Sequence, residues 1–324
     1  MIIRINYLRR IFASYLTPLK SQLTFWYEEP AVNKNLTVTR LGEYYMPFLQ
    51  KANYSEYLDA NGVPRLNYHG KIGLQYNPIA IAQYGLGNYN IYKRTGEVQR
   101  FRKFLLVADW LVNNLERNCY GLAVWNHHFD WEYKTPLKAP WYSGLAQGQG
   151  ISLLVRAYKE TKNDRYLNTA KLAFESFLKT TKAGGVIYTG DNNYTWIEEY
   201  IVEPPTHILN GCIWALWGVY DYYLLTKDTF ARNVFEKVTE SLKNNLQKYD
   251  TGFWSLYEIS NTKMKMLASP FYHHLHICQL NVMYKLTKER VFQDYAIRWE
   301  NYRRNFFKKS FAFFYKSLFK LLYY

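Results

Sequence analysis

Three groups of residues in the second half of the chain could handle protons. Glu198-Glu199-Tyr200 precedes a Pro-Pro turn, Tyr257-Glu258 follows further along the chain, and Tyr272-His273-His274-Leu275-His276 completes the set. Carboxyl, phenol and imidazole groups can each take up or release a proton, so these residue types suit acid–base chemistry on a polar substrate.

The histidines of the third group also raise the question of a metal site. His273 and His276 are separated by two residues, but the chain has no H-E-x-x-H motif and no C-x-x-C pair, and its three cysteines lie far apart. The Gly-x-Gly at residues 148–150 belongs to neither phosphate-binding motif. We therefore expect no metal, no other cofactor and no disulfide framework, as in a reducing compartment.

A Tyr-x-x-Thr pattern recurs four times and divides the chain into similar units. Its threonines are spaced 66, 65 and 61 positions apart, at Thr95, Thr161, Thr226 and Thr287. Before each copy lies a segment that is apolar on nearly all sides, as in NGCIWALWGVYDYY, and after it an amphipathic one, as in FARNVFEKVTESLKNNL. A helix that is apolar all round is buried, so each unit predicts an inner helix followed by an outer one.

This alternation is typical of an (α/α) toroid, although a solenoid of helix hairpins would give a similar pattern. We predict a mainly α protein: an incomplete (α/α) toroid of inner and outer helix hairpins, with a short N-terminal extended or β segment. The expected parts are an N-terminal arm and entry segment (1–60), the toroid (61–300) and a basic amphipathic C-terminal helix (301–324). Since the inner helices of a toroid run parallel, the residues that precede them should meet at one rim.

Polar and aromatic residues precede the inner helices in all four units. Free N–H groups at helix N-termini favour anions, so such a rim suits a carboxylated substrate. The candidate substrate-binding residues are Tyr76, Tyr142, Gln147, Gln149, Asn210, His273 and His276. The two tyrosines would equally suit packing, and a pair such as Glu198-Glu199 is often simply solvated.

The formal net charge of +15 and the aromatic share of 19% narrow the class of partner. A basic excess suggests nucleic acid, an anionic membrane surface or an acidic glycan, and aromatic rings stack on sugars and bases alike. Because no zinc-finger, RNP or helix-turn-helix signature is present, we do not expect nucleic acid to be the partner.

Several segments resemble the C-terminal domain of the D-glucuronyl C5-epimerases. They are YNPIAIAQYGL (76–86), WYSGLAQGQGISLLVRAY (141–158), EEYIVEPPTHILNG (198–211), YDTGFWSLYEI (249–259) and YHHLHICQL (272–280). Together with YLDANGVPRLNY (57–68), they extend the resemblance over residues 57–300. It implies an enzyme that inverts C5 of glucuronate within an acidic polysaccharide such as heparosan or the backbone of heparan sulfate, without a cofactor.

The resemblance also implies the candidate catalytic residues Tyr200, Tyr257, Tyr272 and Glu199. We expect Tyr272 and Glu199 to handle the C5 proton while the other two tyrosines bind the sugar. The reference pKa of tyrosine is about 10, and nearby cations could lower it towards about 8. The sequence departs from the family at Ser260, where animal members carry an arginine that holds the anionic chain.

Other functions remain open at this stage. A polysaccharide lyase would abstract the same proton and then expel the group at C4. A glycoside hydrolase needs two carboxyl groups flanking the bond, for which Glu199 and Glu258 are the candidates. A non-catalytic glycan-binding protein would need the aromatic rim without the protonatable groups.

The two ends of the chain indicate where in the cell the protein is expected to work. The first residues lack the apolar core of a signal peptide, which favours the cytoplasm of a bacterial-type cell. Residues 301–324 carry six Lys and Arg and no acidic residue, a pattern typical of peripheral contact with the inner face of an anionic membrane. The alternative is an outer helix that packs on the toroid. A homodimer is also left open.

Overall fold

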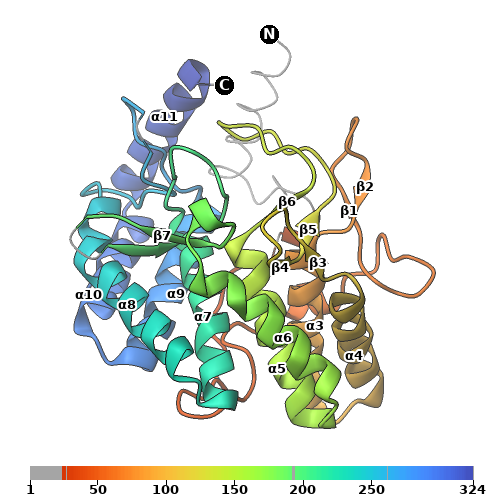
Figure 1. The fold of residues 1–324 in the computed structure, drawn as a ribbon. Coiled ribbons are helices and arrows are strands. Elements are labelled where there is room, and N and C mark those ends of the chain that lie inside the picture. The colour runs from red at the N-terminus through yellow and green to blue at the C-terminus, as the bar shows by residue number, and fades with distance from the viewer. Residues whose placement is uncertain (1–23, 27, 192–193, 261, 324) are drawn as a thin grey trace.

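The fold is built from four consecutive helix hairpins (Figure 1). The computed structural model describes residues 24–26, 28–191, 194–260 and 262–323. The inner and outer helices of the hairpins are α3 (Pro78–Thr95) and α4 (Val98–Asn113), α5 (Gly144–Thr161) and α6 (Asp164–Phe174), α7 (Leu209–Thr226) and α8 (Thr229–Asn245), and α9 (Pro270–Thr287) and α10 (Arg290–Arg304). Inner helices pack in chain order, α3 on α5, α5 on α7 and α7 on α9. This is the predicted incomplete (α/α) toroid.

The repeated Tyr-x-x-Thr pattern forms the turn between each inner and outer helix. The residue after each threonine adopts a left-handed conformation and donates its N–H to the tyrosine carbonyl, as Gly96 does to Tyr92 over 2.8 Å. The threonine hydroxyl then accepts the N–H two residues further on, as Thr95 Oγ1 does from Glu97 over 3.2 Å. The pattern therefore ends one helix and starts the next.

Short strands and loops gather at the opposite end of the hairpins (Figure 1). They form two-stranded antiparallel pairs: β1 (Leu66–Asn67) with β2 (Leu74–Gln75), β3 (Glu116–Arg117) with β4 (Ala123–Val124), β5 (Asn126–His127) with β6 (Trp141–Tyr142), and β7 (Ile187–Thr189) with β8 (Thr195–Ile197). Three inner helices start here with a side-chain cap, from Asn77, Ser143 and Ser269. The N-termini of the inner helices thus share one rim, as expected.

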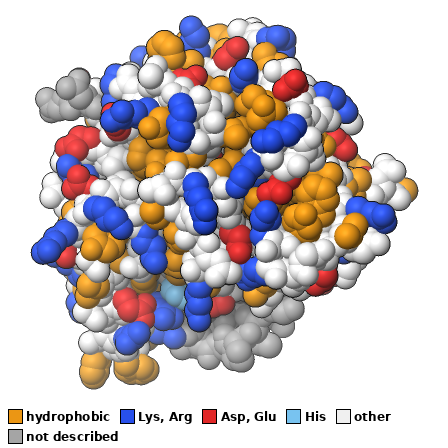
Figure 2. Space-filling view, turned by 90° about the horizontal axis from the view of Figure 1, so that it is seen from below, with side chains coloured by type: hydrophobic (Ala, Val, Ile, Leu, Met, Phe, Trp, Pro, Cys, Tyr) orange, Lys and Arg blue, Asp and Glu red, His pale blue; other side chains and the backbone are white. Residues whose placement is uncertain are grey.

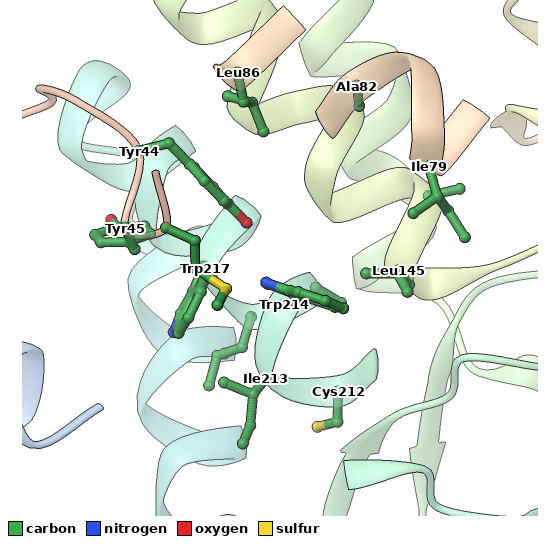
Figure 3. Close-up of a cluster of buried hydrophobic side chains, with 14 of the residues drawn as sticks. Tyr44, Tyr45, Ile79, Ala82, Leu86, Leu145, Cys212, Ile213, Trp214 and Trp217 are labelled. Atoms are coloured by element: carbon green, nitrogen blue, oxygen red, sulfur yellow. The ribbon is translucent and has the colours of Figure 1, made fainter. Parts of the chain in front are cut away.

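An N-terminal segment fills the space between the inner helices. Its described residues form a 3-10 turn, η1 (Thr24–Trp26), and, after a stretch of loop, a short helix, α2 (Leu49–Ala52). Figure 3 shows Tyr44 and Tyr45 reaching in beside Trp214 and Trp217, and the Tyr45 and Trp217 ring centroids are 5.1 Å apart. These side chains belong to the same core cluster as the toroid.

A buried ion pair lies beside this aromatic core. Arg156 Nη1 of α5 is 2.6 Å from Asp221 Oδ2 of α7, and the side chains are 1% and 0% exposed. Asp221 also accepts hydrogen bonds from Tyr45 and Ser152. A buried charge is tolerated when its partners satisfy it in this way, and the network joins two inner helices to the N-terminal segment.

The C-terminal helix α11 (Phe306–Tyr323) packs on the toroid with only one face. Ala312, Phe313 and Phe319 are buried, whereas Phe307 and Phe314 are 81% and 67% exposed. Residues 301–304 belong to α10, so the expected limit at 301 falls inside a helix. Among the described residues, none of the helices combines the length and apolarity of a membrane span.

The basic charge does not gather at the end formed by the Tyr-x-x-Thr turns. Figure 2 shows this end with Lys and Arg side chains scattered among acidic and apolar ones. Such a surface gives no preferred place for a long polyanion. The rim at the other end therefore remains the place to look for chemistry.

Candidate active site

The four candidate catalytic residues come together at the rim. Tyr200 follows β8, Tyr257 lies in the loop before α9, and Tyr272 lies in the first turn of α9. The Tyr257 and Tyr272 ring centroids are 4.9 Å apart, and both rings pack with Tyr200 around Ile208. Residues far apart in the sequence thus form one cluster of phenols, which we call the tyrosine cluster (Tyr200, Tyr257 and Tyr272).

Glu199 lies beside this cluster and is 5% exposed. It packs so tightly on the start of α7 that a Cβ on Gly211 would sit 2.1 Å from its Oε2 atom, and Asn210 Nδ2 donates to that oxygen over 3.4 Å. Burial raises the pKa of Glu199 to about 8, and the neighbouring Glu258 and Glu198 add to the rise although a hydrogen bond with Tyr200 opposes it. A carboxyl group with such a pKa can act as a base near neutral pH.

The pKa values of the three tyrosines differ from the expectation. Burial, and then the charge of Glu199, raises the pKa of Tyr200, Tyr257 and Tyr272 above the usual value for a phenol. The expected lowering towards 8 is therefore wrong, because desolvation of these buried phenols and the charge of the neighbouring carboxyl group both disfavour the ionised form. All three stay protonated at neutral pH and can donate hydrogen bonds or a proton.

A second carboxyl group, Glu258, is fully buried under the same cluster. Its oxygens accept hydrogen bonds from the Tyr133 hydroxyl and from Lys134 Nζ. Lys134 Nζ also lies 2.6 Å from the Oγ atom of Ser260, the residue that replaces the expected arginine. A lysine from another segment thus brings positive charge to this position.

Sequence reasoning missed Tyr133 and Lys134. The Tyr133 ring packs edge-on against Tyr200 with centroids 4.8 Å apart, so it belongs beside the tyrosine cluster. Both residues lie in a loop outside the repeated units, where no periodicity marks a functional residue. The only signal was a phenol and an ammonium group adjacent in sequence within a net-basic chain.

Gln147 and Gln149 were predicted to bind substrate, but both are fully buried inside the toroid. Gln147 accepts the N–H of Trp125 over 2.9 Å and donates to the carbonyls of Ala123 and Ala173. Gln149 accepts a hydrogen bond from Gln83 over 3.0 Å. The structure corrects this assignment: these side chains lie one and two turns inside α5, and they hold neighbouring segments together.

His273 and His276 need the same correction. Both are 0% exposed, and Ser255 Oγ is 2.7 Å from Nδ1 of the first and 3.0 Å from Nδ1 of the second. His273 Nε2 lies 3.0 Å from the carbonyl oxygen of Trp299 in α10. Burial lowers the pKa of His273 to about 3, so it is neutral and cannot hold a carboxylate by charge. The two rings join α9 to its loop and to its outer helix.

The remaining candidates lie at or near the rim. The Tyr76 hydroxyl donates to Asp59 Oδ2 over 2.8 Å, and its ring is 37% exposed. The Tyr142 hydroxyl donates to the Gly184 carbonyl over 2.8 Å. Asn210 contacts Glu199, as described above. Within the described ranges, no three His, Cys, Asp or Glu side chains are grouped as metal ligands.

An open groove of about 560 Å³ is lined in part by Ile259, two residues after Tyr257 in the sequence. Its walls include Tyr188, Tyr194, His207 and Lys248. The His207 ring is paired with Glu198, the neighbour of Glu199, which connects the groove to the buried carboxyl group. The aromatic side chains of this groove suit contact with sugar rings, and its lining carries both a basic residue, Lys248, and an acidic one, Asp191.

Comparison with known proteins identifies the family of the chain. Residues 120–301 match the family model described as the D-glucuronyl C5-epimerase C-terminus. The chain belongs to this family. A D-glucuronyl C5-epimerase of Caenorhabditis elegans is 32% identical over 219 residues, which are 63% of this chain and 35% of that protein. An uncharacterised protein of Methanocaldococcus jannaschii is 27% identical over 219 residues, covering 64% of this chain and 69% of its own length.

The chain thus spans about a third of the C. elegans relative. Among solved structures, cellobiose 2-epimerase from Spirochaeta thermophila aligns with a TM-score of 0.52 and 14% identity over 78% of this chain and 65% of its own. D-mannose isomerase aligns with a TM-score of 0.50 and 12% identity over 93% and 85%. At such identities the likeness concerns the fold, and it confirms the (α/α) toroid.

Proposed function

We propose that the protein converts D-glucuronate into L-iduronate residues within an acidic polysaccharide by inverting C5. The observation that carries this proposal is a buried carboxyl group of raised pKa, Glu199, beside three protonated tyrosines. Membership of the family supports it. Inversion at C5 needs a base on one face of the sugar ring and an acid on the other, and this cluster contains both kinds of group.

The reaction can be written with these residues alone. The Glu199 carboxylate removes the proton from C5, and the electron pair of the broken C–H bond spreads into the adjacent carboxylate of the sugar. The Tyr272 hydroxyl then gives its proton to C5 from the opposite face, and solvent restores both groups. Tyr200 and Tyr257 donate hydrogen bonds to the negatively charged oxygens of the intermediate. Every proton is accounted for.

Incubation with heparosan in deuterated water tests the proposal. An epimerase must bring deuterium to C5 and form iduronate while the chain length stays constant. A lyase would shorten the chain and create an unsaturated uronate that absorbs in the ultraviolet, and a hydrolase would shorten it without deuterium at C5. A glycan-binding protein would change nothing. If heparosan, chondroitin and other glucuronate polymers all stay unchanged, the proposal is wrong.

The exposed face of α11 supports peripheral contact with an anionic membrane at its cytoplasmic side. Phe307, Phe314 and Leu318 are 81%, 67% and 50% exposed, and residues 301–324 carry no acidic side chain. Apolar side chains next to lysines bind anionic lipid surfaces. We expect Phe307→Ser with Phe314→Ser to release the protein from phosphatidylglycerol vesicles without changing its fold. Unchanged vesicle binding would contradict this, and a loss of dimers instead would point to a second copy of the chain.

A further inference from the structure

A short hairpin places one lysine at the mouth of the candidate site. Trp131 and Leu137 exchange two backbone hydrogen bonds, of 2.8 and 3.0 Å, and close the turn that carries Tyr133 and Lys134. Leu137 is buried with Phe129 and Trp141, so the hairpin has an apolar base. Its tip is held over the tyrosine cluster by the contacts of Tyr133 and Lys134 with Glu258.

Lys134 lies between solvent and the buried acid. Its side chain is 20% exposed, whereas that of Glu258 is 0% exposed. An ammonium group has three N–H donors. One goes to Glu258 and one to Ser260 Oγ, so the third remains for an oxygen atom of a bound molecule.

The charged groups around Lys134 favour the binding of one more anion. Two further lysines contact the same loop: Lys265 Nζ donates to the Ser260 carbonyl over 3.2 Å, and Lys316 Nζ of α11 donates to the Leu267 carbonyl. Burial lowers the pKa of Lys316 to about 7, while the charge of Glu258 opposes that fall. Glu199 is mostly neutral below its pKa of about 8. Even without Lys316, two lysines, Lys134 and Lys265, contact this loop beside the single carboxyl group of Glu258.

We infer that Lys134 binds the carboxylate of the reacting uronate and selects uronate over neutral sugars. This inference rests on the proposed function. A hydrogen-bonded cation on that carboxylate stabilises the negative charge that develops when Glu199 removes the C5 proton. Ser260 assists because its hydroxyl accepts a hydrogen bond from Nζ and helps to hold the ammonium group in place.

The test compares Lys134→Met and Lys134→Arg with the control Lys138→Gln. Lys138 lies on the same hairpin, but its side chain is 78% exposed and pairs with Asp130. Binding of heparosan oligosaccharides and of their carboxyl-reduced, neutral counterparts is measured by calorimetry. We expect Lys134→Met to weaken heparosan binding about tenfold or more, to the level of the neutral sugar, because a hydrogen bond to a charged group is lost. Lys134→Arg should recover part of the loss, and Lys138→Gln should stay within about twofold.

A purely structural role is separated by a double variant. Lys134→Met leaves the buried Glu258 without its partner and should lower the melting temperature, which Lys134→Met with Glu258→Gln should restore. If the double variant also recovers heparosan affinity, Lys134 is only a structural partner and the inference is wrong. It is equally wrong if the wild type binds neutral and carboxylated sugars alike.

Heparosan binding and deuterium exchange at C5 are measured separately. The carboxylate-binding role of Lys134 and the epimerase activity can therefore fail independently. Wild-type exchange at C5 with an unaffected Lys134→Met variant would overturn this inference and leave the epimerase intact. Lys134-dependent binding without exchange at C5 would overturn the epimerase and leave the carboxylate site intact.

Discussion

The two ends of the toroid differ in how regularly the inner helices are terminated. At the end with the Tyr-x-x-Thr turns, all four units use the same two hydrogen bonds, one accepted by the tyrosine carbonyl and one by the threonine hydroxyl, with a left-handed residue after the threonine. At the rim, the four units have different residues: an Asn cap before α3, a Ser cap before α5, no side-chain cap before α7 and a Ser cap before α9.

The uncapped helix is the one that meets the candidate base. Glu199 lies against Gly211 and Asn210 in the first turn of α7, where no side chain caps the helix and the Leu209 N–H donates to the Tyr257 carbonyl over 3.2 Å. Burial disfavours the negative charge of Glu199, the hydrogen bond with Tyr200 favours it, and the net result is the raised pKa. Repetition at one end thus maintains the fold, and irregularity at the other end allows chemistry.

The largest effect is expected at the rim, from Glu199→Gln. Removing the base should lower turnover about a thousandfold, measured as deuterium incorporation at C5. The exposed Glu203 in the following loop is the matched control, and Glu203→Gln should keep full activity. If Glu199→Gln retains normal turnover, the base is another group.

The same variant should also change how stability depends on pH. The pKa of Glu199 is raised in the folded state, so the wild type loses stability as the pH rises from about 4.5 to about 8, where the unfolded chain ionises first. The melting temperature of Glu199→Gln should therefore exceed that of the wild type by an amount that grows across this range and then levels off. A constant difference would contradict the assignment.

A smaller loss, about a hundredfold, is expected for Tyr272→Phe and for Tyr200→Phe. Each variant removes one hydroxyl from the tyrosine cluster while the ring keeps its packing. Tyr166→Phe is the control, because its hydroxyl bonds Asp109 between two outer helices. Circular dichroism should show an unchanged fold in all three. Near-normal turnover by either cluster variant would make that tyrosine a packing residue.

His273→Ala tests a residue of the rim that supports the site without touching the substrate. Its ring loses the contacts with Ser255 and Trp299, which should lower the free energy of unfolding by about 2 kcal/mol. Below the melting temperature, KM for heparosan should stay within about twofold of the wild type. A large rise in KM with unchanged stability would return this histidine to the substrate-binding residues.

The smallest effect is expected at the repeated end. Thr226→Ala removes the hydroxyl that accepts the N–H of Asp228 and should cost about 1 kcal/mol in unfolding by urea. Turnover should not change, because the turn lies at the opposite end of α7 from the site. Thr229→Ala, three residues on and exposed, should cost less. A loss of turnover in Thr226→Ala would contradict the view that this end maintains the fold while the rim carries out the chemistry.

The two ends also differ in how far the sequence predicts them. Thr95 and its counterparts recur at near-constant spacing, so the toroid, its hairpins and its single rim could be predicted from periodicity. The convergence of Glu199 and the three tyrosines followed from that rim and from the family resemblance. Contacts between non-repeated loops left no pattern in the sequence, which is why Lys134 was missed.

Some polar residues that the sequence analysis assigned to substrate binding are buried inside the toroid. Gln147 and His276 lie within the first two turns of an inner helix, and the helix turns them inward, where they bond buried backbone or Ser255. A polar residue near a helix start serves structure or substrate according to which face of the helix carries it. The aromatic segments around these residues are apolar on nearly all faces, so periodicity could not decide.

The rate of deuterium incorporation at C5 as a function of pH tests the central claim most directly. If Glu199 is the base, kcat/KM for wild-type protein on heparosan should rise about tenfold per pH unit at low pH and level off above about 8, where the carboxyl group is ionised. The residual rate of Glu199→Gln should lack this rise. A wild-type profile that is flat between about pH 5 and 9, or that Glu199→Gln reproduces in shape, would contradict the account.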